Sequence, residues 1–264
     1  MKKLLAVLLA VSMLFSLSSF FLCAQAASGL DYLLLGDSIA AGAGVINPDE
    51  GCYGRIVADT NGYGYANEAV SGASSSAMLS RLQRSSVQAE VKKAEIISIS
   101  IGGNDYLESF WPGLFLSAMS DQKMFDRIQA SFSNNFAKII QTIRSLNPSA
   151  RILVQTVYNP RSGKMFEGMV QMGVTRLNAV YRSYLSAHPG SYTIVDVGSA
   201  LTGHSDLISL DSIHPNAAGN VVIARVILRT LASLGLGSRT EPVIVNPGVS
   251  SDGFWRKILA LLFN

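Results

Sequence analysis

The sequence predicts a three-layer α/β/α sandwich over about residues 29–236, built on a parallel sheet. Two observations predict this fold. Short apolar runs recur along the chain, and longer stretches with helical periodicity separate them. The length of 264 residues, with 48% hydrophobic and 15% charged side chains, suits one large globular domain. Strands joined by single helices form right-handed crossovers, so helices are expected on both faces of the sheet.

Five apolar segments are predicted as strands. The first, residues 32–35, is a continuous apolar run that ends at Gly36, as expected of a buried parallel strand that meets a turn. The other four strands are expected at residues 64–70, 95–101, 151–157 and 192–197.

Three amphipathic helices are predicted around these strands. The first ends at Asn147-Pro148, and its apolar stripe contains Phe125, Ile128, Phe132, Phe136, Ile139 and Ile143. The second ends near His188-Pro189-Gly190, and its stripe contains Phe166, Val170, Val174, Leu177, Tyr181 and Tyr184. The third is expected to begin near Pro215 and to contain Val221, Val222, Ala224 and Leu228.

The first 26 residues have the pattern of a secretory signal peptide. Met1-Lys2-Lys3 precedes an apolar run over residues 4–22, and the small-residue stretch Ala24-Gln25-Ala26 follows it. We expect cleavage after Ala26 and secretion of the mature chain. An uncleaved membrane anchor is the alternative, because the apolar run approaches the roughly 20 residues that span a bilayer.

Two segments follow the predicted domain. Residues 237–252 contain several Gly and Ser residues and two prolines, which predicts a linker. Residues 253–264 form a short apolar tail with two basic residues. This tail is interpreted either as an interfacial helix on a membrane or cell-wall surface or as a segment docked on the parent domain.

Charge and cysteine content argue against several classes of function. Lys and Arg total 21 against 18 Asp and Glu, and loss of Lys2 and Lys3 leaves 19 minus 18, or +1. The chain has no basic block, which argues against nucleic acid as a partner. Its two cysteines, Cys23 and Cys52, are too few for a disulfide scaffold or a cysteine-built zinc site. Once Cys23 is removed, Cys52 is expected to be an unpaired, buried thiol.

Four polar or glycine-containing turns are expected to meet at one edge of the sheet, because parallel strands all end at the same edge. Ligands of such sheets bind beyond these carboxyl ends. They are Gly36-Asp37-Ser38-Ile39, Ser71-Gly72, Gly102-Gly103-Asn104-Asp105 and Asp211-Ser212-Ile213-His214. Each turn alone has a structural explanation as a helix cap or tight turn. Together they supply a nucleophile, a base, a carboxylate that orients the base, and hydrogen-bond donors, which are the groups that acyl transfer requires.

His214 is the histidine best suited to act as the general base. The chain has three histidines, and His188 lies at a predicted helix end while His204 lies in a loop that could border the site. His214 alone has a carboxylate, Asp211, three residues before it. This spacing puts both side chains on one side of a turn. Asp211 can therefore accept from Nδ1–H while Nε2 faces a nucleophile.

Ser38 is the predicted nucleophile, activated when a neighbouring base removes its proton. It follows a buried strand and opens a helix, where backbone N–H groups and the helix dipole favour a developing oxyanion. The amides of Ser38 and Gly72 and the side-chain amide of Asn104 are expected to donate to that oxyanion. Gly72 suits this role because no side chain blocks its N–H.

The order of these four blocks resembles the SGNH or GDSL hydrolase family. The resemblance covers nearly the whole predicted domain, residues 27–236, and implies a flavodoxin-like sandwich with a five-stranded parallel sheet. It implies that Ser38 is nucleophile and oxyanion donor, that Gly72 and Asn104 are further donors, and that His214 is the base with Asp211 as its partner.

Two positions depart from the family pattern. Ile39 stands where the family name has Leu, and Asn220 stands where relatives often have a second histidine. Neither departure changes the catalytic assignment.

The predicted function is that of a secreted serine esterase or lipase that acts through an acyl-enzyme, with lipid or lysophospholipid acyl esters favoured. An esterase that removes acetyl groups from extracellular glycans is the enzymatic alternative, and a non-catalytic binding module is the other.

The sequence has no Gly-x-Ser-x-Gly elbow, no His-Glu-x-x-His helix and no Walker loop, and it implies neither cofactor nor metal. Residues 106–119 are interpreted as an acyl-pocket wall or lid, or as a helix packed on the core, and Tyr158 is expected to shape the cleft.

Overall fold

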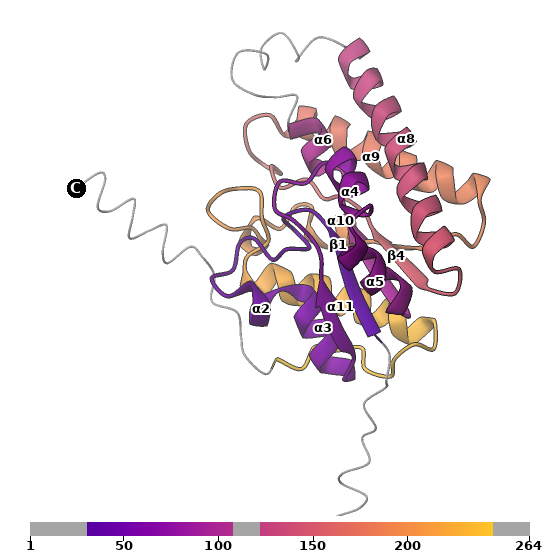
Figure 1. Cartoon of the computed structure of the whole chain (residues 1–264). Coiled ribbons are helices and arrows are strands. Elements are labelled where there is room, and N and C mark those ends of the chain that lie inside the picture. The colour runs from indigo at the N-terminus through magenta and orange to yellow at the C-terminus, as the bar shows by residue number, and fades with distance from the viewer. Residues whose placement is uncertain (1–30, 108–121, 245–264) are drawn as a thin grey trace, which may run out of the picture.

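A five-stranded parallel sheet forms the centre of the molecule (Figure 1). The computed structural model describes residues 31–107 and 122–244. The strands are β1 (Asp31–Gly36), β2 (Gly64–Asn67), β3 (Ile96–Ser100), β4 (Arg151–Gln155) and β5 (Thr193–Val195). Their order is β2-β1-β3-β4-β5, and every neighbouring pair is parallel. The predicted fold class is confirmed, and this strand order is that of flavodoxin-like sheets.

Helices cover both faces of the sheet (Figure 1). One face packs against α3 (Tyr53–Asn61), α10 (Val197–Leu201) and α11 (Ala217–Ser233). The other packs against α4 (Ser75–Arg81), α5 (Ser85–Lys93), α8 (Gln122–Leu146) and α9 (Glu167–Ala187). Shorter helices in the connections are α2 (Pro48–Gly51), α6 (Gly103–Leu107) and the 3-10 turn η2 (Ser205–Leu207).

The side chains of β1 explain why its sequence is apolar without alternation. Leu33 and Leu35 point into the core beneath α4, α5, α8 and α9, whereas Tyr32 and Leu34 point into the core beneath α3 and α11. All four side chains are buried. A central parallel strand must be apolar on both faces, because helices exclude water from each.

The long predicted helices and all five strands are present, and the differences lie at their ends. β2 ends at Asn67, three residues before the predicted end, because the Asn67 side chain turns the chain by bonding Ala40 O and Ala69 N. β5 ends at Val195 because Asp196 caps α10, accepting from Ser199 N at 3.2 Å. α11 begins at Ala217 and not at Pro215, because the Asn216 side chain caps it.

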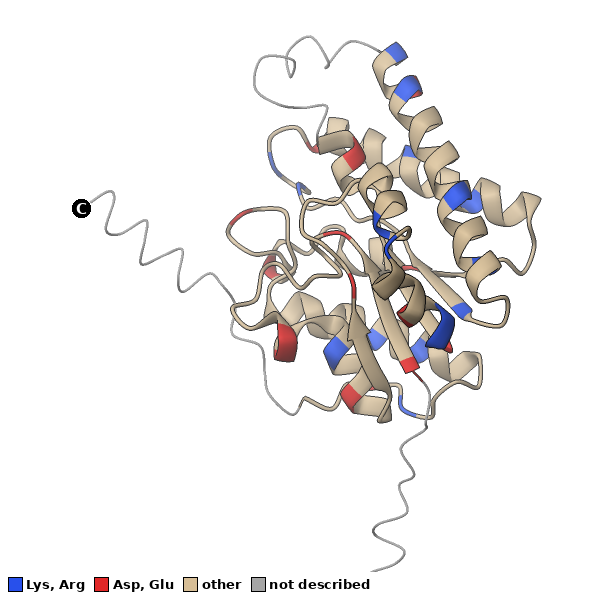
Figure 2. Cartoon of the chain, viewed as in Figure 1, with Lys and Arg blue, Asp and Glu red and all other residues tan. Residues whose placement is uncertain are grey.

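The start of the predicted linker lies along the domain. Glu241 forms ion pairs with Arg225 at 2.7 Å and Arg229 at 2.5 Å, and the Val243 amide donates to Thr60 Oγ1 at 3.0 Å. The predicted signal peptide (1–26), the rest of the linker and the tail (253–264) lie outside the described residues. Within the described ranges, no helix is both long enough and apolar enough to cross a bilayer. Acidic and basic residues are interspersed over the helices and loops in the view of Figure 2.

Gly36 sets how closely the ends of β1 and β3 approach. Its φ is +136°, and an added Cβ would lie 1.8 Å from the Ser100 carbonyl oxygen. The next amide, that of Asp37, donates to this same oxygen at 2.9 Å. The first residue of the Gly36-Asp37-Ser38 turn must therefore be glycine for the turn to leave the sheet at this point.

Gly36→Ala is expected to lower the free energy of unfolding by at least ~3 kcal/mol, because the backbone of β3 must move and the φ is unfavourable. Gly190→Ala is the matched control: its φ is +80°, but no atom lies within 4 Å of the added Cβ. It should lose only ~1 kcal/mol. Urea unfolding of both variants measures the difference, and equal losses would contradict the close approach of β1 and β3.

Candidate active site

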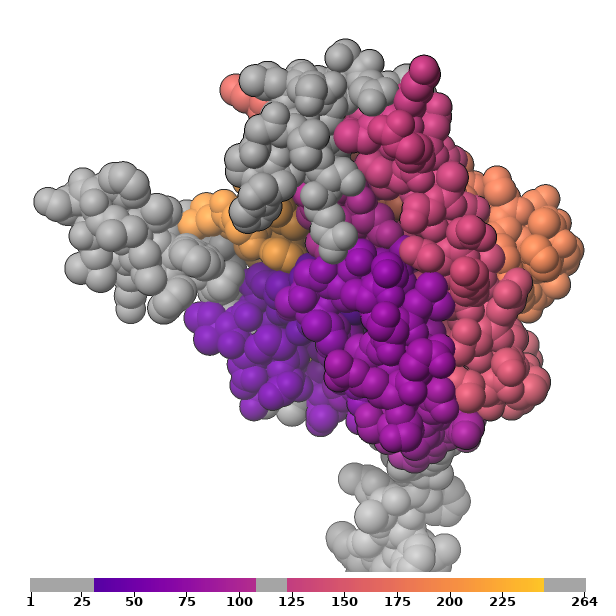
Figure 3. All heavy atoms as spheres, turned by 45° about the horizontal axis from the view of Figure 1, so that its top comes forward, coloured from indigo at the N-terminus to yellow at the C-terminus, as the bar shows by residue number. Residues whose placement is uncertain are grey.

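The residues predicted to act together lie at the carboxyl edge of the sheet. Ser38 follows β1, Gly72 lies between β2 and α4, Asn104 lies in α6 after β3, and Asp211 and His214 precede α11. β1 lies between β2 and β3, where the direction of the strand order reverses. Open α/β sheets bind ligands at such a position. Figure 3 turns the top of Figure 1 toward the viewer, and purple segments of the first third of the chain lie beside orange residues near position 210.

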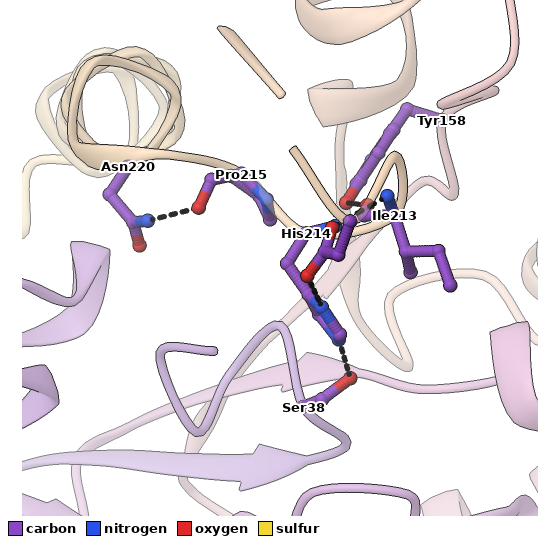
Figure 4. Close-up of polar contacts among 7 residues, drawn as sticks. Ser38, Tyr158, Ile213, His214, Pro215 and Asn220 are labelled. Atoms are coloured by element: carbon purple, nitrogen blue, oxygen red, sulfur yellow. Dashed lines mark hydrogen bonds and ion pairs between the residues drawn. The ribbon is translucent and has the colours of Figure 1, made fainter. Parts of the chain in front are cut away.

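Ser38, His214 and Asp211 form a continuous hydrogen-bonded row. Figure 4 shows the His214 imidazole pointing toward Ser38. His214 Nε2 lies 2.8 Å from Ser38 Oγ, and His214 Nδ1 lies 2.7 Å from Asp211 Oδ2. Asp211 Oδ1 accepts from the amides of Ile213 at 2.8 Å and His214 at 3.0 Å. The carboxylate is therefore fixed by the same turn that carries the imidazole.

Asp211 is held in its ionised form. Partial burial acts to raise its pKa, but the hydrogen bonds from the His214 ring and from the His214 and Ile213 amides bring the pKa well below its usual range. An ionised carboxylate at Nδ1 keeps the imidazole proton on that nitrogen. Nε2 is then free to accept the proton of the Ser38 hydroxyl.

Gly72 and Asn104 belong to two segments that a hydrogen bond joins. Asn104 Nδ2 donates to the carbonyl of Ala73, the residue after Gly72, at 3.0 Å. A primary amide has two N–H groups, so this bond uses one of them. Gly72 is exposed, its φ is +79°, and no atom lies within 4 Å of the position a Cβ would occupy. The space next to its Cα is therefore open.

Asp105 has a supporting role that the sequence did not reveal. Its Oδ2 accepts from the Ser75 amide at 2.9 Å, and its Oδ1 accepts from the Ser75 hydroxyl at 2.5 Å. Asn135 of α8 donates to that hydroxyl at 2.9 Å. These bonds tie α6 to the start of α4 and so hold the loops that carry Asn104 and Gly72. An acidic residue in a polar turn gives no sequence signal for such a contact.

Asp37 is a second carboxyl at the site, with an environment opposite to that of Asp211. It is 4% exposed, and its Oδ1 accepts from the Ile39 amide and the Ser100 hydroxyl, both at 3.1 Å. Burial raises its pKa to about 7, although these bonds and the nearby His214 lower it in part.

A cavity of about 530 Å³ is lined in part by residues next in sequence to the nucleophile and the base. Its wall includes Ile39 and Ile213, the neighbours of Ser38 and His214 in the sequence, and Tyr158 as expected. Apolar residues of α6 and α9 form another part of the wall, and they include Tyr106, Leu107, Met169, Val174 and Leu177. Residues 108–119 of the predicted acyl-pocket segment lie outside the described residues. Over residues 31–107 and 122–244, no group of three or more His, Cys, Asp or Glu side chains is arranged to hold a metal ion.

Residues 34–222 match the GDSL-like lipase/acylhydrolase family. The chain belongs to this family. Its members are named as lipases and acylhydrolases, and the chain is accordingly an acylhydrolase of the esterase or lipase type. The resemblance of the four sequence blocks to this family is thus confirmed.

Relatives match over most of their own length. Protein YpmR of Bacillus subtilis (strain 168) is 28% identical over 212 residues, which cover 76% of this chain and 81% of that protein. The crystal structure of the lipase Lip_vut3, from a goat rumen metagenome, has a TM-score of 0.63 and 21% identity, covering 79% of this chain and 99% of that one. A variant of Axe2, an acetyl-xylooligosaccharide esterase from Geobacillus stearmophilus, has a TM-score of 0.56 and 18% identity, covering 77% and 95%. The two structures share the fold with this GDSL-family chain.

The raised pKa of Asp37 predicts a pH dependence of stability. Below about pH 4 the carboxyl is protonated in both the folded and the unfolded chain. As pH rises from about 4 toward 7, the unfolded chain releases this proton first, so the carboxyl progressively destabilises the fold. Asp37→Asn cannot ionise, and its stability relative to wild type should rise through this window by up to ~4 kcal/mol. Urea unfolding of both proteins at several pH values measures the difference, and parallel profiles would refute the prediction.

Proposed function

We propose that the protein is a secreted serine esterase that hydrolyses carboxylic esters through an acyl-enzyme. The observation that carries the proposal is the row of hydrogen bonds from Asp211 through His214 to Ser38, with distances of 2.7 and 2.8 Å. This arrangement provides a nucleophile, a base within hydrogen-bond reach, and a carboxylate that orients the base. Membership of the GDSL-like lipase/acylhydrolase family supports ester hydrolysis as the reaction.

The proposed reaction has two stages. In the first, Ser38 Oγ attacks the ester carbonyl carbon while His214 Nε2 takes the hydroxyl proton, and Asp211 stabilises the imidazolium that forms. The amides of Ser38 and Gly72 and the side chain of Asn104 donate to the negatively charged oxygen. His214 then gives its proton to the departing alcohol, and the acyl group stays on Ser38. In the second stage His214 removes a proton from water, and the resulting hydroxide attacks the acyl carbonyl carbon. His214 then gives this proton to Ser38 Oγ as the bond between Ser38 and the acyl group breaks, which releases the carboxylic acid and restores the serine hydroxyl.

The favoured substrates are esters with long acyl chains, such as lipid or lysophospholipid esters. The apolar cavity lined by Asp37 and Ile39, the two sequence neighbours of Ser38, supports this choice, because its volume of about 530 Å³ far exceeds the needs of an acetyl group. Removal of acetyl groups from extracellular glycans is the alternative, and it requires only the mouth of the cavity. Secretion is proposed from the signal-peptide pattern of residues 1–26.

Ser38→Ala and His214→Ala are each expected to lower kcat by several orders of magnitude while the protein stays folded, because they remove the nucleophile and the base. Labelling with a fluorophosphonate probe should be lost in Ser38→Ala. Ser76→Ala, which changes an exposed serine of α4, should label and turn over like wild type. Full labelling of Ser38→Ala would refute the nucleophile, and wild-type turnover in His214→Ala would refute the base.

Filling the cavity should shorten the preferred acyl chain. Gly173 of α9 faces the cavity, and an added Cβ would meet the Tyr106 ring no closer than 3.5 Å, which is ordinary contact. Gly173→Leu should therefore fold and lower kcat/KM for p-nitrophenyl esters of long acids at least ten-fold, with little change for the acetate. Gly168→Leu, at an exposed position of the same helix, is the control. A uniform change for all chain lengths would contradict acyl binding in this cavity, and efficient acetate release from acetylated xylan would favour the glycan alternative.

A further inference from the structure

Three consecutive carbonyls around His214 each accept a hydrogen bond from a different part of the chain. Tyr158 Oη donates to Ile213 O at 2.6 Å. The Ser209 amide donates to His214 O at 2.8 Å, and Asn220 Nδ2 donates to Pro215 O at 3.2 Å. Figure 4 shows the bonds from Tyr158 and Asn220 on the two sides of the imidazole. The backbone that carries the base is therefore held at every residue.

The bond from Tyr158 acts on the peptide group directly before the base. A peptide group is planar, so the Ile213 carbonyl and the His214 amide turn together. The carbonyl accepts from Tyr158, and the amide donates to Asp211 Oδ1 at 3.0 Å. Tyr158 and Asp211 thus hold opposite edges of the Ile213–His214 peptide plane. The position of this plane determines the position of the His214 Cα, from which the imidazole side chain extends.

The residue before Ile213, Ser212, adopts an unfavourable backbone conformation that surrounding contacts must stabilise. Ser212 has a φ of +61°, in the left-handed region that a residue with a side chain rarely adopts. Such a residue keeps this conformation when the surrounding contacts leave no alternative. The bond from Tyr158 to the following residue, Ile213, is a contact of this kind.

The opposite side of the turn is fixed by close packing. Gly44 has a φ of +103°, and an added Cβ would lie 2.1 Å from Pro215 O and 3.1 Å from His214 Cβ. Gly44 belongs to the same loop as Ser38. The loop of the nucleophile and the turn of the base are therefore in direct contact, and Tyr158 is the side chain that holds the turn from the side of β4.

Tyr158 is well suited to act as a permanent donor. Its side chain is 6% exposed, and burial, with smaller contributions from Asp37 and Asp211, raises the pKa of its hydroxyl well above the usual range. The hydroxyl therefore stays protonated at neutral pH. Its ring also forms part of the cavity wall.

We propose that Tyr158 is a positioning residue for the general base: its hydroxyl, through the Ile213–His214 peptide, sets the distance between His214 Nε2 and Ser38 Oγ. The inference rests on the proposed ester hydrolysis. Tyr158 touches neither reacting atom, so its effect must be transmitted through the imidazole. Removal of the hydroxyl should leave the ring in the cavity wall and so affect kcat and not KM.

Tyr158→Phe tests the proposal. We expect kcat for p-nitrophenyl esters to fall about ten-fold, which corresponds to ~1.4 kcal/mol, with KM within two-fold of wild type. Tyr63→Phe is the matched control, because Tyr63 Oη donates to Leu236 O at the same 2.6 Å but at the other end of the sheet. It removes an equivalent bond and should leave kcat unchanged. Thermal unfolding of both variants compares the stability that each loses.

A second measurement probes the state of the His214 imidazole and does not depend on turnover. In protein labelled with 15N-histidine, 15N–1H correlation spectra report the tautomer and protonation of each imidazole. Tyr158→Phe should alter the His214 signals and leave those of His188 and His204 unchanged, whereas Tyr63→Phe should alter none. Wild-type kcat together with unaltered His214 signals in Tyr158→Phe would overturn the proposal. Failure of the wild-type protein to hydrolyse any ester would reject the proposed function instead, and the spectra would still decide whether Tyr158 positions His214.

Discussion

The hydrogen bond between Ser38 and His214 joins two loops that are 176 residues apart in the sequence, and the parallel sheet makes this contact possible. All five strands run in one direction, so the loops that follow them leave from the same edge. Apolar cores on both faces fix the strands relative to one another. The distance between the hydroxyl and the imidazole therefore depends on packing that lies well away from both groups.

The two carboxyl groups near the nucleophile differ in their exposure to water, and this difference gives them different protonation states and roles. Asp211 is partly exposed and accepts from the imidazole and two amides, so it stays ionised and can stabilise a positive charge. Asp37 is adjacent to Ser38 in the chain, but its carboxyl is buried and bonded to Ser100, with a pKa near 7. Adjacent sequence position alone would suggest Asp37 as the acidic partner, whereas the local environment favours Asp211.

The sequence predicted the parts of this molecule that have strong local patterns. β1 is apolar on both faces and every residue of β3 is buried, and α8, α9 and α11 are long enough to repeat an apolar stripe over several turns. Helices such as α4 and α10 were not predicted, because five to seven residues do not establish a period. The Ser38, Asp211 and His214 positions followed from spacing and from the scarcity of histidine. The bonds from Tyr158 to Ile213 and from Asp105 to Ser75 did not, because they depend on which atoms of distant loops face each other.

The contacts of residues 237–244 have a consequence for how the domain can be handled. Asp31 begins β1, and Glu241 and Val243 lie against α11 and the end of α3, so the chain enters and leaves the described domain on the side opposite the cavity. A bead, reporter protein or surface linked at either of these ends would hold the domain with its cleft pointing outward. Immobilised protein of this kind would keep its entrance free for bulky molecules in the surrounding solution.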